Sequence, residues 1–251
     1  MIIRTAEELN KVKTAAKINT EALHYAVSIT KIGISSLEVD TKVEEFYRKN
    51  SVKPAFIGVR GAKFPYPKTI NFQINNQVVH NIPNAQQIVE DGDVVSIDTG
   101  CIYDGYYADQ AVSFGVGEVH EDDQKLLNIG KLSVEAACNK AIPGATTGDL
   151  GYVQQSIIEM AGFSVVKILC GHEIGKSLWE RIKIPAFGRP GEGDKLRENL
   201  LICIENQVCE GSDAVYTADD GWAILTKDGK NSVTFEHMVI VKKKPEIITR
   251  I

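Results

Sequence analysis

The chain has 251 residues, 43% of them hydrophobic, and its 28 basic and 33 acidic residues give a formal charge of −5 that argues against nucleic acid as a direct partner. No apolar run approaches the ~18 residues of a membrane span and the amino terminus lacks a leader pattern, so we expect a cytoplasmic protein without a membrane partner. Five cysteines, an odd number without CxxC spacing, argue against a disulfide framework and a thiolate zinc site, and we expect them reduced in the core.

The first predicted elements are two helices. Thr5 and Glu8 have capping-box spacing, and apolar residues at helical intervals predict a long amphipathic helix that ends near residue 31. Ser35 and Glu38 repeat the spacing and start a shorter helix through residue 47. Residues 52–58 follow as an extended segment, so the order is helix, turn, helix, strand.

The second half of the chain repeats this order. A helix is predicted at 126–141, another at 146–160, and a strand at 163–170. Two such units indicate a duplicated α+β half rather than a solenoid, which needs three or more repeats, although any pair of amphipathic helices gives a similar pattern. An offset of about 111 residues aligns Gly33 with Gly144, Ser35 with Thr146, and Glu38 with Asp149.

The rest of the chain is predicted to be rich in strands. Asp-Gly pairs favour the tight turns of β-hairpins. We find no low-complexity linker, so a single domain over residues 1–251 is expected. The three predicted hairpin turns are Asp104-Gly105, Asp220-Gly221 and Asp228-Gly229.

Two aspartates are predicted to lie close together on the first hairpin. Asp98 follows the apolar run 94–97, and Asp109 lies on the strand that leaves the turn at 104–105. In a two-residue hairpin the paired positions sum to 209, so both side chains share one face as diagonal neighbours, roughly 7–8 Å apart at the backbone. Two like charges so close are unfavourable unless a cation lies between them.

Two glutamates interrupt strands that otherwise look buried. Glu205 follows the apolar run 201–204, and Glu236 lies between 233–235 and 238–241. An ionised carboxylate there is unfavourable unless it is paired or bound to a metal. Structural ion pairs are the alternative, but none of these four strands contains Arg or Lys. The pattern therefore favours a cation cluster.

One histidine completes the candidate ligand set. His172 is predicted at the end of a strand, between Gly171 and residues 173–175, and the HExxH zinc signature is absent because Lys176 stands in the second position. One imidazole with four carboxylates is an oxygen-rich set that suits Mn, Fe, Co or Zn. Enough carboxylates are present to bridge two ions.

These residues and their flanking sequences resemble the type I methionine aminopeptidases of the pita-bread metallopeptidase family (M24), over almost the whole chain. The resemblance implies an α+β pita-bread (creatinase/aminopeptidase) fold, with two pseudo-symmetric halves around a central antiparallel sheet, and one catalytic domain. The matching stretches are Tyr66-Pro67-Lys68, residues 75–83 around His80, residues 91–98 ending in Asp98, residues 171–175 around His172, Asp220-Gly221-Trp222 and Phe235-Glu236-His237.

The resemblance also implies a role for each residue and a reaction. It implies two divalent metal ions (Co, Mn, Fe or Zn) and hydrolysis of the first peptide bond of N-terminal methionyl peptides or nascent chains, including chains at the ribosome. Glu205 would also transfer the proton. We expect a monomer. The implied roles make Asp98 a ligand of one metal, His172 and Glu205 ligands of the other, Asp109 and Glu236 bridges, and His80 a neighbour of the scissile bond.

The chain departs from the family pattern around the substrate. Trp179 replaces a second histidine that donates a hydrogen bond to the substrate carbonyl, a loss that typically costs on the order of 10²–10³ in rate. The indole N–H could still donate, or Trp179 could only pack. Asn71 replaces a small thiol residue, and its amide would need a partner. Leu178 replaces an aromatic residue and Asn206 a proline, whereas Tyr66 and Trp222 match pocket positions, although either could equally belong to the core.

Three functions remain open from the sequence. The first is removal of the initiator methionine, and the second is a peptidase of the same fold with altered specificity, such as cleavage before proline. The third is a peptide-binding pseudoenzyme, although such relatives generally lose metal ligands. Metal analysis and hydrolysis of methionyl against Xaa-Pro peptides would discriminate among them.

Overall fold

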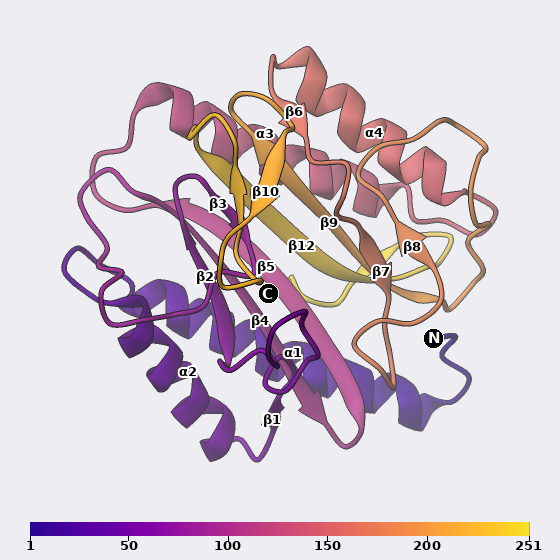
Figure 1. Ribbon diagram of the computed structural model, residues 1–251. Coiled ribbons are helices and arrows are strands. Elements are labelled where there is room, and N and C mark those ends of the chain that lie inside the picture. Colours follow the sequence, from indigo (N-terminus) through magenta and orange to yellow (C-terminus); the bar gives the residue numbers. More distant parts are fainter. Residues whose placement is uncertain (251) are drawn as a thin grey trace.

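Four helices flank the strands in two pairs. Figure 1 shows α1 and α2 along one side of the strands, and α3 and α4 along the other. No helix within residues 1–250 is long and apolar enough to cross a membrane. In this computed structural model, which describes residues 1–250, the helices are α1 (Ala6–Ile29), α2 (Ser36–Lys49), α3 (Glu121–Asn139) and α4 (Thr147–Met160).

The strands form antiparallel ladders. In the first half β4 pairs with β1, β2 and β5, and in the second half the order is β13-β12-β9-β7-β8, with β6 also on β9. A third, small sheet has the order β10-β11-β3. The strands are β1 (Lys53–Pro54), β2 (Ile70–Ile74), β3 (Gln77–Val79), β4 (Val94–Tyr103), β5 (Tyr106–Gly115), β6 (Ser164–Val165), β7 (Gly171–Glu173), β8 (Lys183–Ile184), β9 (Leu201–Cys209), β10 (Val215–Thr217), β11 (Ile224–Thr226), β12 (Ser232–Ile240) and β13 (Glu246–Ile247).

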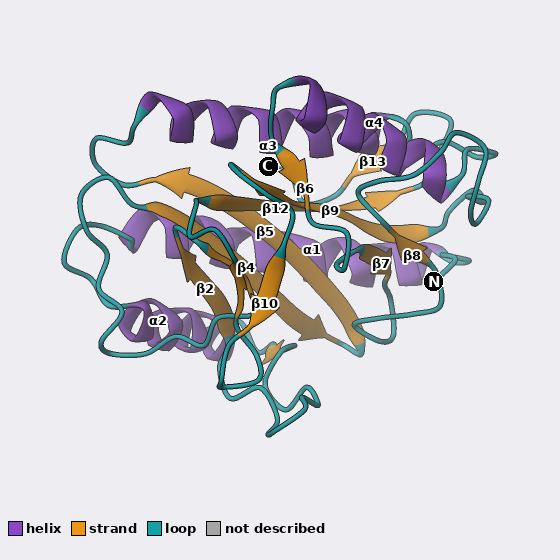
Figure 2. Cartoon of the chain, turned by 45° about the horizontal axis from the view of Figure 1, so that its top comes forward, coloured by secondary structure: helices purple, strands orange, loops and turns teal. Residues whose placement is uncertain are grey.

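The two large ladders meet along β5 and β12, which run side by side between the helix pairs (Figure 2). The hydroxyl of Ser113 on β5 donates to the carbonyl of Thr234 on β12 and accepts from its N–H, both at 2.8 Å. We call this contact between β5 and β12 the seam. Near its other end, the N–H of Asp109 donates to the sulfur of Met238 at 3.4 Å. Side chains therefore join the two ladders into the predicted central layer.

The predicted duplication is confirmed in the local structure of the helix starts. Both α2 and α4 begin with a complete capping box, Ser35 with Glu38 and Thr146 with Asp149. In both halves, a later segment of the chain also accepts a hydrogen bond from the first residue of the helix. Ser36 N–H donates to Gln87 O at 2.9 Å, and Thr147 N–H donates to Asp194 O at 3.0 Å. Each half has its own apolar core, around Leu23, Phe72 and Ile97 in the first half and around Leu126, Leu150 and Ile204 in the second.

The helix predictions are confirmed with shifted boundaries. At α1, Thr5 Oγ1 accepts from Glu8 N–H, but the Glu8 carboxylate accepts from Arg4 N–H, so the capping box is only half formed. The third helix begins at Glu121, five residues earlier than predicted, because His120 caps it. Its first turn is polar, and the apolar periodicity on which the prediction depended starts only at residue 126.

Three strand predictions are wrong in part. Only Ser164–Val165 of the predicted strand 163–170 is a strand, and of residues 52–58 only Lys53–Pro54. His172 lies inside the short strand β7, paired with Cys203, and not beyond the end of a long strand. The turn at Asp220-Gly221 does join paired strands β10 and β11, but the turn at 228–229 joins β11 and β12, which belong to different sheets.

Candidate metal centre and substrate pocket

The hairpin of β4 and β5 positions two aspartates as predicted. Asp98 pairs with Ala111 and Asp109 pairs with Gly100, which is the register of a two-residue turn at 104–105. The turn residues both have positive φ, 47° and 80°, as a type I′ turn requires. The turn chemistry therefore sets the face on which both carboxylates lie.

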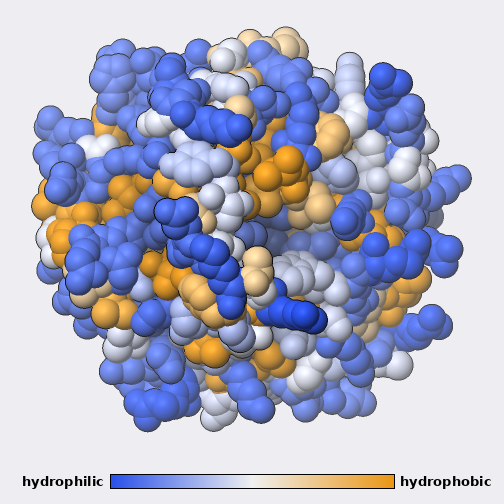
Figure 3. All heavy atoms as spheres, viewed as in Figure 1, coloured by the Kyte–Doolittle hydropathy of each residue, from blue (hydrophilic) through white to orange (hydrophobic). Residues whose placement is uncertain are grey.

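Two glutamates face each other across β9 and β12. Glu205 and Glu236 are directly paired, an arrangement in which like charges are destabilising. Together with the two aspartates and His172 they line one cavity. Figure 3 shows that this face of the molecule is hollowed near its centre. All five predicted ligands are thus brought together from four long strands and β7.

The imidazole of His172 points its Nε2 at the carboxylates. Nε2 lies 3.6 Å from Asp109 Oδ2 and 3.9 Å from Glu236 Oε1. On the other side of the ring, Nδ1 lies 3.2 Å from Glu173 O, which favours the tautomer with a proton on Nδ1. Nε2 then keeps a free lone pair, as in histidines that bind metals.

The carboxylates lack the partners that buried charges need. Within residues 1–250, no Lys or Arg forms an ion pair with any of the four, so the alternative of structural ion pairs fails. Burial raises the pKa of Asp98 and Glu236 well above the usual range, and the neighbouring carboxylates raise both further. Burial also raises the pKa of Asp109 to about 8 and that of Glu205.

Several carboxylate oxygens have no hydrogen-bond partner although they are buried. A buried polar atom without a partner costs ~1–3 kcal/mol. Bound divalent ions would remove this penalty and the repulsion together, so the donor set fits the metal ions that the sequence predicts. The atoms concerned are Asp98 Oδ1, Asp109 Oδ1 and Glu236 Oε1.

Two amide side chains hold the outer oxygens of the ligands. Asn71 Nδ2 donates to Asp98 Oδ2 at 2.9 Å, which supplies the partner that a buried amide here requires. Gln207 Nε2 donates to Glu205 Oε2 at 2.7 Å. Sequence reasoning missed Gln207, although its position two residues after Glu205 on the same strand places both side chains on one face.

A thiol also lies among the ligands. The ligand atoms of Asp109, His172, Cys203 and Glu236 all lie within 4.8 Å of one another. The expectation that the cysteines are unpaired and largely buried is confirmed, but Cys203 lies beside the candidate centre. CxxC spacing could not reveal it. The sequence feature that could have identified Cys203 was its position two residues before Glu205.

The pocket beside the carboxylates is largely apolar and aromatic. The ring of Trp222 meets Tyr66 edge-on at 5.0 Å and His80 at 6.3 Å. Leu178 and Asn71 also line this cavity. Burial lowers the pKa of His80 to about 4, so its imidazole is neutral at neutral pH. Its φ of 60° is uncommon for a histidine and aims the side chain at the site.

Trp179 stands at the rim of the cavity. Its side chain is 55% exposed, and its ring lies edge-on to His172 with centroids 6.5 Å apart. A residue so exposed is not a core residue, which disfavours the packing interpretation. The next residue, Glu180, forms an ion pair with the amino group of Met1 at 2.8 Å, and so does Glu173 at 3.1 Å. These contacts hold the segment that carries Trp179.

Asn206, in contrast, lies away from the cavity. Its fully buried amide donates to Gly130 O at 2.8 Å and to Ser133 Oγ at 2.7 Å. Its Oδ1 accepts from the N–H of Phe235 at 3.3 Å. This residue therefore attaches β9 to α3 and has a structural role.

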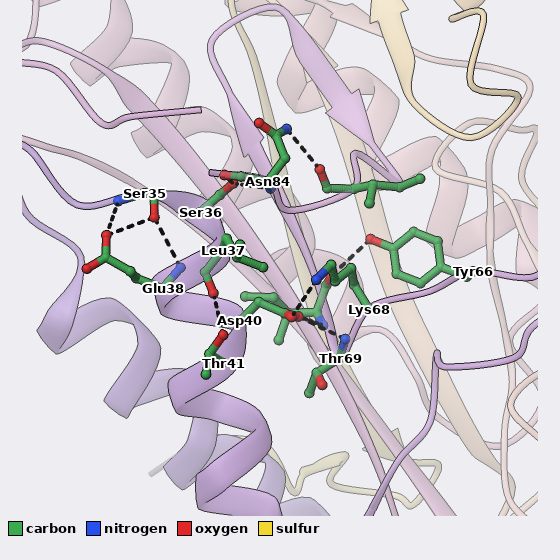
Figure 4. Close-up of polar contacts among 12 residues, drawn as sticks. Ser35, Ser36, Leu37, Glu38, Asp40, Thr41, Tyr66, Lys68, Thr69 and Asn84 are labelled. Carbon is green, nitrogen blue, oxygen red and sulfur yellow. Dashed lines mark hydrogen bonds and ion pairs between the residues drawn. The ribbon is translucent and has the colours of Figure 1, made fainter. Parts of the chain in front are cut away.

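Helix α2 fixes the strand that carries the pocket residues. Figure 4 shows Asp40 on α2 pointing at Lys68 and Thr69. Its buried carboxylate accepts from the N–H of Thr69 at 2.8 Å and of Ile70 at 3.1 Å. Lys68 Nζ lies 3.8 Å from the other oxygen. The start of β2, and with it the position of Asn71, is thus attached to the helix.

Comparison with known sequences matches residues 10–243 to the profile described as Metallopeptidase family M24. The chain is 37% identical over 252 residues to the methionine aminopeptidase of Clostridium perfringens, covering 100% of this chain and 99% of that protein. It is 33% identical over 252 residues to methionine aminopeptidase 1 of Bacillus subtilis, with full coverage of both.

Comparison with solved structures agrees. The crystal structure of the Thermotoga maritima methionine aminopeptidase superimposes with a TM-score of 0.95 at 35% identity over 100% of both chains. The Pyrococcus horikoshii prolidase superimposes with a TM-score of 0.74 at 22% identity, and the match covers 63% of that chain. The second likeness shows the shared fold alone.

Proposed function

This chain belongs to metallopeptidase family M24, and we propose on that basis that it removes the N-terminal methionine from peptides and nascent proteins with two divalent metal ions. It is a metallopeptidase with the pita-bread fold. The observation that carries the proposal is the set of four carboxylates, two buried and two partly buried, and one imidazole around a single cavity, with no Lys or Arg partner within residues 1–250.

The arrangement of the strands supports the ligand roles that we propose. Asp109 and Glu236 lie on the adjoining strands β5 and β12 and both approach His172 Nε2, which supports the proposal that they would be shared by two ions. Asp98 would then hold one ion, and His172 and Glu205 would hold the other. When bound, the ions would lower the pKa of a water towards ~7 and polarise the substrate carbonyl.

Glu205 is the proton carrier in this proposal. Its carboxylate lines the same cavity as the other four ligands, where the substrate and the attacking water would bind. The hydrogen bond from Gln207 uses one lone pair of Oε2, and the lone pairs that remain would serve the metal and the proton of the attacking water. The same carboxylate would return the proton to the leaving amine.

The pocket explains a preference for an apolar first residue. Tyr66, Trp222 and Leu178 offer apolar surface, while the amide of Asn71 is occupied by Asp98 and does not face the pocket unpaired. Neutral His80 can accept or donate one hydrogen bond beside the scissile bond. Trp179 at the rim supplies at most an indole N–H where relatives of this type have a histidine.

Peptide hydrolysis tests the proposal. Purified protein loaded with Co, Mn, Fe or Zn should release methionine from Met-Gly-Met-Met-type peptides in preference to Xaa-Pro peptides. Glu205→Ala should abolish turnover and weaken metal binding. Cleavage of Xaa-Pro peptides alone would support the altered specificity, and peptide binding with neither metal nor hydrolysis would support the pseudoenzyme.

Location and assembly are part of the same proposal. We infer a cytoplasmic monomer with one catalytic domain over residues 1–251 that acts on chains at the ribosome. Sedimentation of the purified protein tests the monomer. Cosedimentation with translating ribosomes tests the site of action.

A further inference from the structure

Cys203 lies at the bottom of the candidate metal centre. It is fully buried on β9, directly paired with His172 on β7 and with Met238 on β12. Because side chains alternate along a strand, Cys203 shares its face with Glu205, two residues later. The thiol therefore points to the side of the sheet that carries the carboxylates.

The distances are compatible with one shared ion. The sulfur and the ligand atoms of Asp109, His172 and Glu236 lie within 4.8 Å of one another. Four tetrahedral donors on one zinc-sized ion, with bonds of ~2.0–2.3 Å, lie about 3.3–3.8 Å apart. The most distant of these atoms would thus approach one another by about 1 Å to share one ion, a shift of the size that side-chain torsions supply.

The ligand set predicted from the sequence has only oxygen and nitrogen donors, whereas Cys203 adds a softer sulfur donor. Carboxylates alone suit Mn and other hard ions, whereas a thiolate favours Zn and similar soft ions. One nitrogen, one sulfur and two carboxylate oxygens are donors that zinc accepts, and Glu205, assigned to the same ion in the proposed function, would be a fifth.

We propose that Cys203 is a further metal ligand, which makes the subsite beside His172 selective for thiophilic ions such as Zn(II) or Cd(II). The inference rests on the proposed metal-dependent function but concerns this residue alone. Metal binding releases the thiol proton to solvent, and the sulfur lone pair forms the new bond. The neighbouring Met238 sulfur accepts from Asp109 N–H and keeps that strand in place.

Spectroscopy of the whole protein tests this proposal directly. Protein loaded with Co(II) should show an intense near-ultraviolet thiolate-to-cobalt charge-transfer band, and ¹¹³Cd-loaded protein should give an NMR resonance shifted downfield from the all-oxygen and nitrogen range. Both readouts use the unmodified chain, so neither depends on whether a variant folds. Absence of both signals from metal-loaded protein would overturn the proposal, even if the protein hydrolyses methionyl peptides.

Variants identify the sulfur responsible. Cys203→Ser and Cys203→Val should lose the band, while Cys209→Ser, a buried cysteine on the same strand in a different apolar cluster, should keep it. In competition titrations the preference for Cd(II) over Mn(II) should fall by about tenfold or more in the Cys203 variants. A band that persists in a folded Cys203 variant would refute the assignment.

Discussion

The metal-free protein should lose stability as the pH rises from 6.5 to 8. Burial holds the pKa of Asp109 at about 8, against a usual value near 3.8. The folded state therefore keeps a proton in this range that the unfolded state has already released. The contribution of Asp109 to stability is complete below the pKa of the unfolded state. It is lost as the pH rises through the pKa of the folded state.

The size of the effect follows from proton counting. One proton that only the folded state retains across about 1.5 pH units corresponds to a loss of ~2 kcal/mol in the free energy of unfolding. Asp98 and Glu236, whose pKa values are also raised, add to it. Total stabilities are ~5–15 kcal/mol, so the loss is measurable. Burial lowers the pKa values of His80, His172 and His237, and the unfolded state is still half protonated at each near pH 6.5, so these groups oppose the trend by ~0.4 kcal/mol each. The larger effect of the three carboxyl groups still gives a net loss of stability.

Urea unfolding of chelator-treated protein at pH 6.5, 7.25 and 8 measures this loss. Asp109→Asn, which keeps the shape and removes the titrating group, should flatten the dependence. Metal-loaded protein should show no such loss, because the ligands are deprotonated when the ions are bound. A metal-free stability that is constant or rises over this range would refute the argument that the carboxyls are desolvated.

Three further outcomes are expected. Trp179→His should raise kcat/KM on methionyl peptides at least tenfold by restoring a donor, and a lower value would mean that Trp179 serves another substrate. Ser35→Ala should destabilise the protein by ~1 kcal/mol through loss of the α2 cap, measured by urea unfolding against the exposed control Ser28→Ala. Gly148→Ala should cost ~1–3 kcal/mol in the same assay, because its Cβ would lie 2.3 Å from Arg189 O, and an unchanged midpoint would contradict this.

The sequence predicted those parts of the site that depend on local signals. An Asp-Gly turn fixes the register of its own hairpin, so the relation of Asp98 to Asp109 could be read without a structure. Capping boxes likewise fixed the starts of α2 and α4. The family was also recognisable, because its ligands occur in order with their flanking residues.

Features that depend on distant pairing could not be predicted. The direct pairing of Glu205 with Glu236 joins strands separated by two intervening elements. Val166 and Leu169 are apolar because they pack in a small core cluster, not because they continue a strand. Cys203 was missed because its importance depends on its pairing with His172, although its place two residues before Glu205 was visible.

The carboxylates are divided evenly between the two halves, and this division determines how the site responds to a movement of one half relative to the other. β4 and β5 carry two acids and β9 and β12 carry the other two, so the centre has the construction of a twofold dimer interface within one polypeptide. A small rotation of one half relative to the other would shift one pair against the other as a unit. Mutations at the seam, such as at Ser113, should therefore alter metal spacing without touching a ligand.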